Sequence, residues 1–401
     1  MLPRAQEIYW RDGHQIQLLS EGEIYIPAML TAITNAEDFI LVELYLAQDG
    51  RLWRQFRRAL IQAALRGVRV YILLDHFGSQ GVSRQERAYL SQAGIRLRFF
   101  NPLHWRKLSH NLVRNHRKLL LIDGDLAFVG GFGWSDEFLP YAWHPNPKDG
   151  DKVAWKEVAV QVQGPSVHQW LNLFVHTWQQ GQAESATSAA IPEDFSLAFF
   201  TRAADQQQPL GLLHLGRVVC GQGLLLQGVK RSLLYRILRA RECIWIATPY
   251  FAPSWRLRRY LRLAARRGVD VRLLLAGPRH DHPAVRYAGQ RFYLRLLLAG
   301  VRIFEYQPRF THAKVCLCDT WVSIGSCNFD SWSLHWNLEA NQEVLSAEFA
   351  QELSQWFARA WPETQEIQLE TWLKRSWYRK ARQWWWGRVD TWLTRLTKAS
   401  R

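Results

Sequence analysis

Residues 64–74 read ALRGVRVYILL and residues 265–275 read ARRGVDVRLLL, and the two stretches agree at seven of eleven positions. Each joins the end of a helical pattern to a run of apolar residues through a glycine, Gly67 or Gly268. A glycine in that place is typical of a helix that ends in a tight turn before a buried strand. Because the match lies in two distant parts of the chain, it predicts an internal duplication.

The elements around this repeat occur in the same order in both halves. Each half has an apolar strand, a helix and, after the repeat, a second strand led by glycine. These elements are residues 39–45, 52–65 and 94–100 in the first half and residues 244–250, 255–267 and 300–306 in the second. Apolar strands that alternate with helices are typical of parallel strands covered by helices on both faces. The fold class is therefore α/β, with two pseudo-symmetric αβα sandwich domains.

Shifts in composition predict the domain boundaries. We place the first domain at residues 1–190 and the second at residues 216–361. The linker, residues 191–215, belongs to a stretch rich in Ala, Ser, Gln and Asp with little apolar periodicity. Residues 362–401 form a tail that has no counterpart in the first half.

The overall composition is that of a globular protein with an anionic partner. Hydrophobic residues make up 48% of the 401 residues and charged residues 21%, which excludes global disorder and low-complexity architecture. The net charge of +16 favours nucleic acid, an anionic membrane surface or phosphate-bearing substrates. The five cysteines have no paired spacing, so we expect reduced, mostly buried thiols. We find no signal-peptide pattern and no apolar run of about 18 residues, and we expect no membrane span.

Each half carries a His, a Lys two positions later and an Asp five positions after the Lys. These six candidate catalytic residues are His116, Lys118 and Asp123 in HRKLLLID, and His312, Lys314 and Asp319 in HAKVCLCD. One such triplet is expected by chance on the order of a few per cent of the time in a chain of this length. Two triplets in equivalent places of a duplication indicate a function.

The spacing of the triplets suits chemistry on a phosphate. Side chains alternate along a strand, so His and Lys share one face, whereas Asp points to the other face and is better placed to anchor a loop. An imidazole nitrogen can attack phosphorus or protonate a leaving oxygen while the ammonium group neutralises a second oxygen.

Polar residues follow each triplet. After the second triplet, in GSCNFDSWSLHWNLEA, Ser326 and Asn328 can donate to a phosphoryl oxygen and Glu339 can orient an imidazole. The first half has Gly131 and Gly133 in place of Ser326 and Asn328, and Glu157 follows in KEVAVQV. The two halves are therefore not equivalent.

The doubled His-x-Lys-x4-Asp with a downstream Gly-Ser-x-Asn resembles the phospholipase D superfamily and, within it, the bacterial cardiolipin synthases. The resemblance extends over about residues 15–361. Its details are Gly130-Gly131 followed by Asp136-Glu137, Asn337 to Asn341, the strand end at Glu43 to Tyr45, and Tyr250-Phe251. It implies two phospholipase D-like domains, followed here by a Trp/Arg-rich amphipathic C-terminal tail.

The resemblance also implies a two-step displacement at phosphorus that needs no metal and no cofactor. One His forms a phosphatidyl-histidine while the other protonates the departing alcohol and then deprotonates the acceptor, which is phosphatidylglycerol in a cardiolipin synthase. By analogy His116 is the nucleophile and His312 the acid and base, although the symmetry of the sequence leaves this assignment open. Lys118 and Lys314, with Ser326 and Asn328, would hold the phosphate; Glu157 and Glu339 would fix the imidazole tautomers.

Three positions depart from the family pattern. Gly133 stands where the family usually has Asn. Five residues separate Asp319 from Gly325 where the family has six, and the effect of this shortening on the loop of Ser326 and Asn328 stays open. Trp332 occupies a position that is often Arg.

The C-terminal segment predicts peripheral binding to a membrane. Residues 372–401 contain nine Lys or Arg, one acidic residue and six Trp. One helical face collects Leu373, Trp377, Ala381, Trp384, Trp385, Trp392 and Leu396. Such a helix would lie on an anionic bilayer, and the resemblance places that bilayer at the cytoplasmic face of the bacterial cell membrane. The alternative is an ordinary helix that packs its Trp side chains on the domain.

The basic aromatic stretch 103–107 could serve the same surface or be a plain loop.

Other functions share these features. A nuclease would use the same phosphorus chemistry and the same positive charge. We expect no nucleic acid partner, because the cations concentrate with Trp at the terminus and no nucleic-acid-binding module is recognised. A phosphatidylserine synthase or a hydrolytic phospholipase D would differ only in the acceptor, and a lipid-binding module without activity is disfavoured by the filled His and Lys positions. The oligomeric state stays open.

Overall fold

The computed structural model describes residues 9–103, 110–140, 143, 154–183, 213–222, 226–330 and 333–376. The elements of the first half are β1 (Arg11–Leu19), α1 (Gly22–Asn35), β2 (Phe39–Leu44), α2 (Arg51–Leu65), β3 (Arg69–Asp75), α3 (Arg84–Gln92), β4 (Arg96–Phe100), η1 (His110–Leu112), β5 (Leu119–Ile122), β6 (Leu126–Gly130), η2 (Asp136–Phe138), β7 (Ala159–Gln163), α4 (Ser166–Gln180) and β8 (Gln182–Ala183).

The second half repeats this order. Its elements are β9 (His214–Gln222), β10 (Leu226–Gln227), α7 (Gly228–Arg239), β11 (Cys243–Thr248), α8 (Trp255–Arg266), β12 (Asp270–Ala276), α9 (Pro283–Gln290), α10 (Tyr293–Leu297), β13 (Arg302–Tyr306), β14 (Val315–Cys318), β15 (Trp321–Gly325), α11 (Ser333–Trp336), β16 (Leu338–Leu345), α12 (Ala347–Ala360), η4 (Trp361–Glu363), β17 (Thr364–Glu366) and α13 (Leu369–Leu373).

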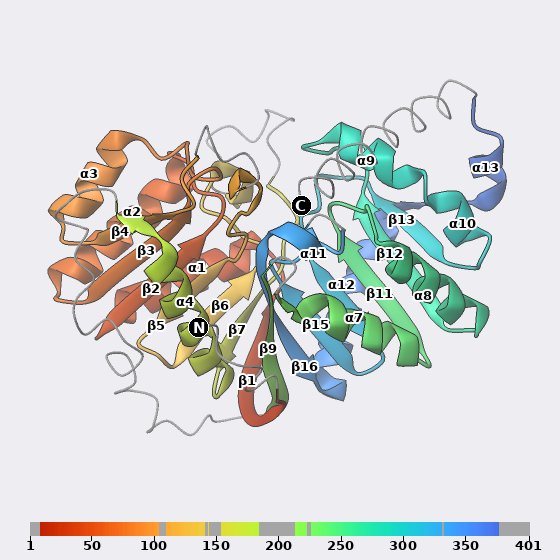
Figure 1. Ribbon diagram of the computed structural model, residues 1–401, viewed down its shortest axis with the longest axis horizontal. Helices are drawn as coiled ribbons and strands as arrows, with labels where there is room; N and C mark the ends of the chain where they lie inside the picture. Colours follow the sequence, from red (N-terminus) through yellow and green to blue (C-terminus); the bar gives the residue numbers. More distant parts are fainter. Residues whose placement is uncertain are drawn as a thin grey trace.

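The strands of the first half pair in the order β8, β4, β3, β2, β5, β6, β7 and β1. Those of the second half pair in the corresponding order β17, β13, β12, β11, β14, β15, β16 and β9. Antiparallel pairing of β1 with β9, where His14 lies opposite His214, joins the two series. Figure 1 shows the halves side by side, with β1 and β9 at their junction.

Helices cover each sheet on both faces because the central strands are apolar on both faces. The outer face of the first sheet packs against α1 and α2, and that of the second against α7, α8 and α10. The inner faces share one core with α4 and α12, in which Trp170, Trp178 and Trp356 are buried. The predicted fold of two α/β sandwiches is therefore confirmed.

Two details of the sheets differ from the prediction. Among the strands that the structure describes, β2 to β4 and β11 to β13 pair in parallel, whereas β5 and β14, which follow the His-x-Lys pairs, run antiparallel to their neighbours. Both strands begin one residue after the motif lysine, so His and Lys lie in the extended segment before the strand. Two consecutive strands can be parallel only if a long crossover, usually a helix, connects them. Short turns join β5 to β6 and β14 to β15, so these hairpins are antiparallel.

The first residues of the predicted tail belong to the second domain. Residues 364–366 form β17, which pairs with β13, and Trp372 is buried with its ring centroid 5.0 Å from that of Tyr293. For Trp372 the alternative interpretation, packing on the domain, is the one that the structure shows. Leu373, the first residue of the proposed amphipathic face, is 51% exposed at the end of α13, and the other residues of that face, from Trp377 to Leu396, lie outside the described residues.

Several other predicted features fall wholly or partly outside the described residues. These are most of the linker (191–212), Trp332 and most of the stretch 103–107. The last two positions of the predicted linker, His214 and Leu215, already belong to β9. In the part of the chain that the structure describes, no helix is both long and apolar enough to cross a membrane.

Candidate active site

A backbone contact between the halves positions His116. Asn115 forms a parallel bridge with Leu338: the His116 N–H donates to the Leu338 carbonyl (3.0 Å), and the Leu338 N–H donates to the Arg114 carbonyl (2.9 Å). Leu338 begins β16 in the second half and precedes Glu339. The bridge therefore sets a carboxylate of the second half beside the histidine of the first half.

The same contact recurs around His312. Lys156 forms a parallel bridge with Thr311, and the His312 N–H donates to the Lys156 carbonyl at 2.8 Å. Lys156 precedes Glu157, so here a carboxylate of the first half lies beside the histidine of the second half. Each half thus supplies the histidine of its own motif and a glutamate that lies beside the histidine of the other half.

Both crossed carboxylates contact the Nδ1 atom of their histidine. The distance is 3.0 Å from Glu339 Oε1 to His116 Nδ1 and 2.7 Å from Glu157 Oε2 to His312 Nδ1. A carboxylate in that place holds the proton on Nδ1, which leaves Nε2 of the neutral ring free for chemistry. The predicted roles of Glu157 and Glu339 thus have a geometric basis, although the exchange between halves was not foreseen.

Each lysine lies beside the histidine of its own motif. Lys118 Nζ and Lys314 Nζ donate to the carbonyls of His116 and His312, both at 2.6 Å. The two pairs then differ, because Lys314 Nζ is also 3.0 Å from His312 Nε2, whereas Lys118 Nζ lies 5.2 Å from the centroid of the Tyr45 ring. Both ammonium groups are buried.

The buried cluster favours an anionic ligand. Burial and the charge of Lys314 lower the pKa of Lys118 to about 7, and burial lowers that of Lys314 to about 8. Burial, followed by the charges of the two lysines, lowers the pKa of His312 well below its usual value, so its contact with Glu157 is a hydrogen bond from a neutral ring. Burial also raises the pKa of Glu157 to about 7. A phosphate would stabilise the protonated forms of the two lysines and so restore their positive charge.

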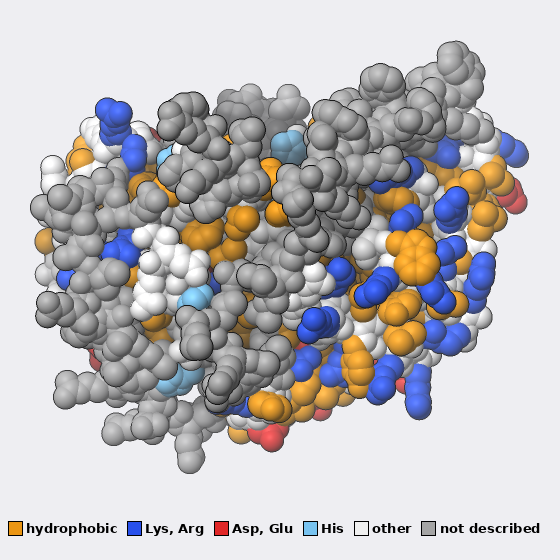
Figure 2. Space-filling view, in the orientation of Figure 1, with side chains coloured by type: hydrophobic (Ala, Val, Ile, Leu, Met, Phe, Trp, Pro, Cys, Tyr) orange, Lys and Arg blue, Asp and Glu red, His pale blue; other side chains and the backbone are white. Residues whose placement is uncertain are grey.

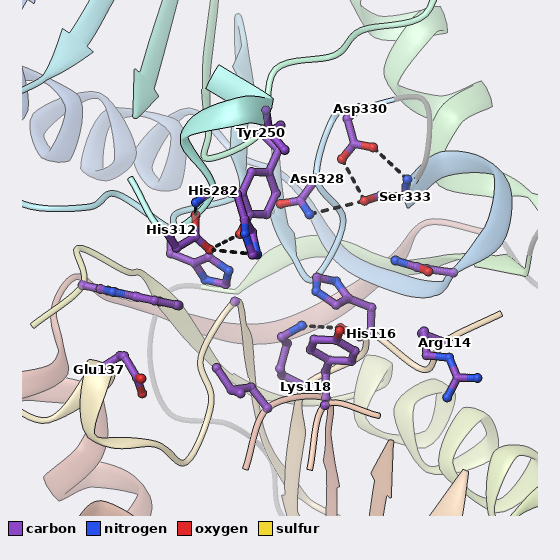
Figure 3. Close-up of a pocket in the computed structure, with 18 of the residues that line it drawn as sticks. Arg114, His116, Lys118, Glu137, Tyr250, His282, His312, Asn328, Asp330 and Ser333 are labelled. Atoms are coloured by element: carbon purple, nitrogen blue, oxygen red, sulfur yellow. Dashed lines mark hydrogen bonds and ion pairs between the residues drawn. The ribbon is translucent and has the colours of Figure 1, made fainter. Parts of the chain in front are cut away.

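One cavity of about 780 Å³ is lined by several of these groups. Its lining includes both histidines together with Lys118, Asn328, Tyr45 and Tyr250. Figure 3 shows His116 and His312 turned toward the same space from opposite halves of the molecule. Two imidazoles can therefore act on one reacting group.

Ser326 is turned to a carboxylate and is not among the residues that line the cavity. Its Oγ donates to Glu339 Oε2 at 2.5 Å and accepts from the Ala340 N–H at 3.1 Å, so the hydroxyl positions a carboxylate rather than a phosphate. Pairing of β15 with β16 puts Ser326 opposite Ala340, which explains the contact. Asn328 does line the cavity: its Nδ2 donates to Ser333 Oγ at 3.3 Å, and its Oδ1 has no hydrogen-bond partner among the described residues.

The glycines of the first half fit spaces that larger residues would overfill. A Cβ on Gly131, the counterpart of Ser326, would lie 2.3 Å from Glu157 Oε2. A Cβ on Gly133 would lie 2.9 Å from the Leu46 carbonyl oxygen. The asparagine usual in the family therefore cannot be accommodated at position 133 without a shift of the neighbouring backbone.

The motif aspartates lie away from the cavity and anchor the sheets. Asp123 accepts the N–H groups of Glu37, Asp38 and Phe39 at 2.8 to 2.9 Å. Asp319 accepts three N–H groups ahead of β11 in the same way. Both aspartates have positive φ, 53° and 52°, as a tight hairpin turn requires. They hold the start of β2 and β11 beside the motif strand.

The shorter spacing between Asp319 and Gly325 does not displace the following loop. Cys318 pairs with Trp321 across a two-residue turn, whereas Ile122 pairs with Leu126 across a three-residue turn. Beyond the turn the registers agree, because Val315 pairs with Ile324 as Leu119 pairs with Val129. The deletion is absorbed at the far end of the hairpin, and the strand register that leads to Ser326 is unchanged.

Sequence reasoning assigned no role to several residues of the site. Tyr45 packs its ring edge-on to His116, with centroids 4.7 Å apart, and the Tyr250 hydroxyl donates to Asp281 at the cavity wall. Asp75 accepts the Asn115 N–H at 2.8 Å and thereby supports the segment ahead of His116. The sequence did contain a signal for these residues, because each lies at the carboxyl end of a predicted strand: Tyr45, Tyr250 and Asp281 follow β2, β11 and β12, and Asp75 ends β3. Ligand sites of α/β sheets lie at these strand ends. No group of three or more His, Cys, Asp or Glu in the described ranges is arranged to hold a metal ion.

A duplicated α/β scaffold that brings two histidines, each with a lysine beside it, to one cavity defines a phospholipase D-type enzyme. The sequence profile of the family described as cardiolipin synthase, PLD-like domain, matches residues 29–146 and 233–361. The chain is 33% identical over 347 residues to cardiolipin synthase B of Escherichia coli strain K12, covering 86% of this chain and 79% of that protein. It is 31% identical over 368 residues to cardiolipin synthase 2 of Bacillus anthracis, covering 91% and 68%.

The chain belongs to the cardiolipin synthase family of phospholipase D-like proteins and is a phosphatidyltransferase. Its fold is similar to that of a phosphatidylserine synthase from Haemophilus influenzae Rd KW20, with a TM-score of 0.68 at 12% identity over 88% of this chain and 87% of that one. The phospholipase D-like fold predicted from the sequence is thereby confirmed.

Proposed function

We propose that this protein is a cardiolipin synthase that transfers a phosphatidyl group to phosphatidylglycerol through a phosphatidyl-histidine. The observation that carries the proposal is the pair of imidazoles in one cavity, each with a buried carboxylate on Nδ1 and an ammonium group beside it. The names of the relatives support the choice of phosphatidylglycerol as acceptor.

In the first step, Nε2 of His116 attacks the phosphorus of the donor phospholipid. The bond from phosphorus to the headgroup oxygen breaks, and His312 gives that oxygen a proton. The phosphodiester anion offsets the repulsion between the two lysines and a protonated His312, and Glu157 stabilises the imidazolium. Lys118, Lys314 and Asn328 hold the non-bridging oxygens.

In the second step, His312 takes the proton from a glycerol hydroxyl of phosphatidylglycerol. The resulting oxygen attacks phosphorus, the bond from phosphorus to His116 breaks, and the enzyme returns to its starting state. The products are cardiolipin and the headgroup alcohol of the donor.

One asymmetry favours His116 as the nucleophile. Lys314 Nζ lies 2.9 Å from Nδ1 and 3.0 Å from Nε2 of His312, so in the free enzyme this ammonium group crowds both ring nitrogens of that histidine. Lys118 instead directs its ammonium group to the His116 carbonyl and the Tyr45 ring. Glu339 is further fixed by the Ser326 hydroxyl, which holds the His116 tautomer.

The substrates place the enzyme at a membrane, and we propose peripheral association with the cytoplasmic face of the bacterial cell membrane. The net charge of +16 supports attraction to anionic lipids.

Incubation of the purified protein with phosphatidylglycerol vesicles tests this function. We expect mass spectrometry to detect a dianionic four-chain lipid with wild type and to detect none with His116→Ala or His312→Ala, both of which should keep the wild-type circular dichroism spectrum. Formation of phosphatidic acid alone would support a hydrolytic phospholipase D. Formation of phosphatidylserine when serine is supplied, or cleavage of single-stranded DNA without lipid transfer, would contradict the proposal.

A further inference from the structure

A second, smaller pocket lies on the outer face of the second half, between α8 and α10. It has a volume of about 40 Å³ and is lined by Trp255, Arg258, Arg262, Phe292, Arg295 and Leu296. None of these residues lines the catalytic cavity. A space of this size accommodates a group of a few heavy atoms, such as a phosphate.

The pocket carries positive charge that the described residues do not compensate. Arg258, Arg262 and Arg295 have no carboxylate partner among those residues. The Nε atom of Arg258 is buried and lacks a hydrogen-bond partner in the described part of the chain. Burial lowers the pKa of Arg258, and the nearby charges of Arg291, Arg295 and Arg262 lower it further. Three guanidinium groups gathered in this way have the composition of an anion site.

The corresponding helix of the first half lacks this excess. On α2, Arg54 forms an ion pair with Asp49 at 2.9 Å, and Arg57 forms one with Glu86. The α8 helix begins with its N-cap Ser254 and buries Leu257 and Leu261 as α2 buries its own apolar face, so the scaffold is retained. The halves differ because the arginines of α2 have acidic partners, whereas Arg258 and Arg262 of α8 have none among the described residues.

The two helices that form the arginine pocket carry exposed apolar side chains, Trp255 at the start of α8 and Leu298 just after α10. Trp255 is 58% exposed and Leu298 63%, and the guanidinium of Arg259 lies 5.2 Å from the Trp255 ring centroid. Figure 2 shows Lys and Arg side chains interspersed with hydrophobic ones over the region of α7 and α8. Arginine mixed with exposed tryptophan and leucine suits the headgroup region of an anionic bilayer, where rings insert and cations meet phosphates. Nucleic acid would leave the apolar part of this surface unmatched.

We propose that the arginine pocket between α8 and α10 binds the phosphate of an anionic phospholipid headgroup and docks the second half of the protein on the bilayer. The proposal rests on the proposed function in one respect, since that function supplies the reason for the protein to meet a membrane. The bound lipid is a docking ligand and not the substrate, because the pocket shares no residue with the catalytic cavity.

The test compares a pocket variant with a matched control. Arg262→Gln with Arg295→Gln removes two charges from the pocket, and Arg58→Gln with Arg84→Gln removes two exposed charges from the outer face of the first half. We expect the pocket variant to bind vesicles of phosphatidylglycerol and phosphatidylcholine about tenfold more weakly than wild type in a sedimentation assay. The control should change binding by less than about twofold. Thermal unfolding of both variants checks that the fold is intact.

The readouts separate this proposal from the catalytic one. With short-chain phosphatidylglycerol below its micelle concentration, the pocket variant should keep wild-type transfer activity. If wild type has no transfer activity, the proposed function fails, but the vesicle comparison still stands. Equal losses in the pocket and control variants, unchanged binding by the pocket variant, or wild-type affinity for single-stranded DNA above that for vesicles at equal ionic strength would overturn the docking proposal.

Discussion

The two halves share a scaffold but hold their catalytic carboxylates differently. Glu339 accepts hydrogen bonds from Ser326 Oγ and, at 3.4 Å, from Asn337 Nδ2. Glu157 has Gly131 in the place of the serine and accepts instead from the Val158 N–H at 2.9 Å. A nucleophile benefits from a fixed tautomer, whereas an acid and base must change charge in each step. Glu339 is thus held by two side chains, whereas Glu157 is held by a backbone N–H and lies 3.9 Å from Lys314 Nζ.

The largest expected effect distinguishes the two histidines. We expect His116→Asn to lower kcat by about 10⁴-fold or more and His312→Asn by about 10²- to 10⁴-fold. A phosphodiester whose leaving group needs no proton, such as a nitrophenolate, should restore a burst of product with His312→Asn but not with His116→Asn. Rapid-quench kinetics measures the burst, and a burst from the His116 variant alone would reverse the assignment of nucleophile.

A smaller effect is expected where the two carboxylates are held. Gly131→Ser places a Cβ that would lie 2.3 Å from Glu157 Oε2, so the carboxylate must move and kcat should fall about 100-fold. Ser326→Ala removes one hydrogen bond to Glu339 without a clash and should cost about tenfold. Steady-state kinetics of both variants provides the comparison. Equal activity of Gly131→Ser and wild type would show that Glu157 does not depend on the space left by the glycine.

The smallest expected effect is in the pH dependence. In the free enzyme Glu157 loses its charge as the pH falls through about 7, and kcat/KM should fall with it because His312 loses its carboxylate partner. On the alkaline side Lys118 loses its proton near pH 7 and Lys314 near pH 8, so kcat/KM should fall there as well. Lys314→Arg keeps its charge, and the alkaline fall should then depend on one proton instead of two. An alkaline limb that is unchanged in this variant would argue against a role for the Lys314 charge.

The sequence was sufficient to predict the duplication, both His and Lys pairs and the anchoring role of the aspartates. Side chains alternate between the two faces of an extended segment, so the sequence alone shows which nearby residues share a face. This explains that success. It could not reveal that Glu339 serves His116 and that Glu157 serves His312. That exchange depends on the bridges of Asn115 with Leu338 and of Lys156 with Thr311, which join residues far apart in the chain.

Composition was a weaker guide than topology at two positions. Ser326 lies at a spacing that suggests a phosphate donor, but the pairing of β15 with β16 turns its hydroxyl to Glu339. Trp372 lies in a basic, tryptophan-rich stretch that suggests a membrane surface, yet it is 6% exposed and packs on Tyr293. In both cases a long-range contact decided the environment of a side chain whose neighbours in sequence indicated something else.

The exchange of carboxylates also restricts how the two copies can diverge. A substitution at Glu157 in the first half removes a contact of His312 in the second half, and a substitution at Glu339 removes a contact of His116 in the same way. Neither half can lose its histidine or its glutamate while the other half stays active. Such reciprocal dependence also means that two fragments, separated between β8 and β9, would each be inert alone and could recover turnover only by reassociating.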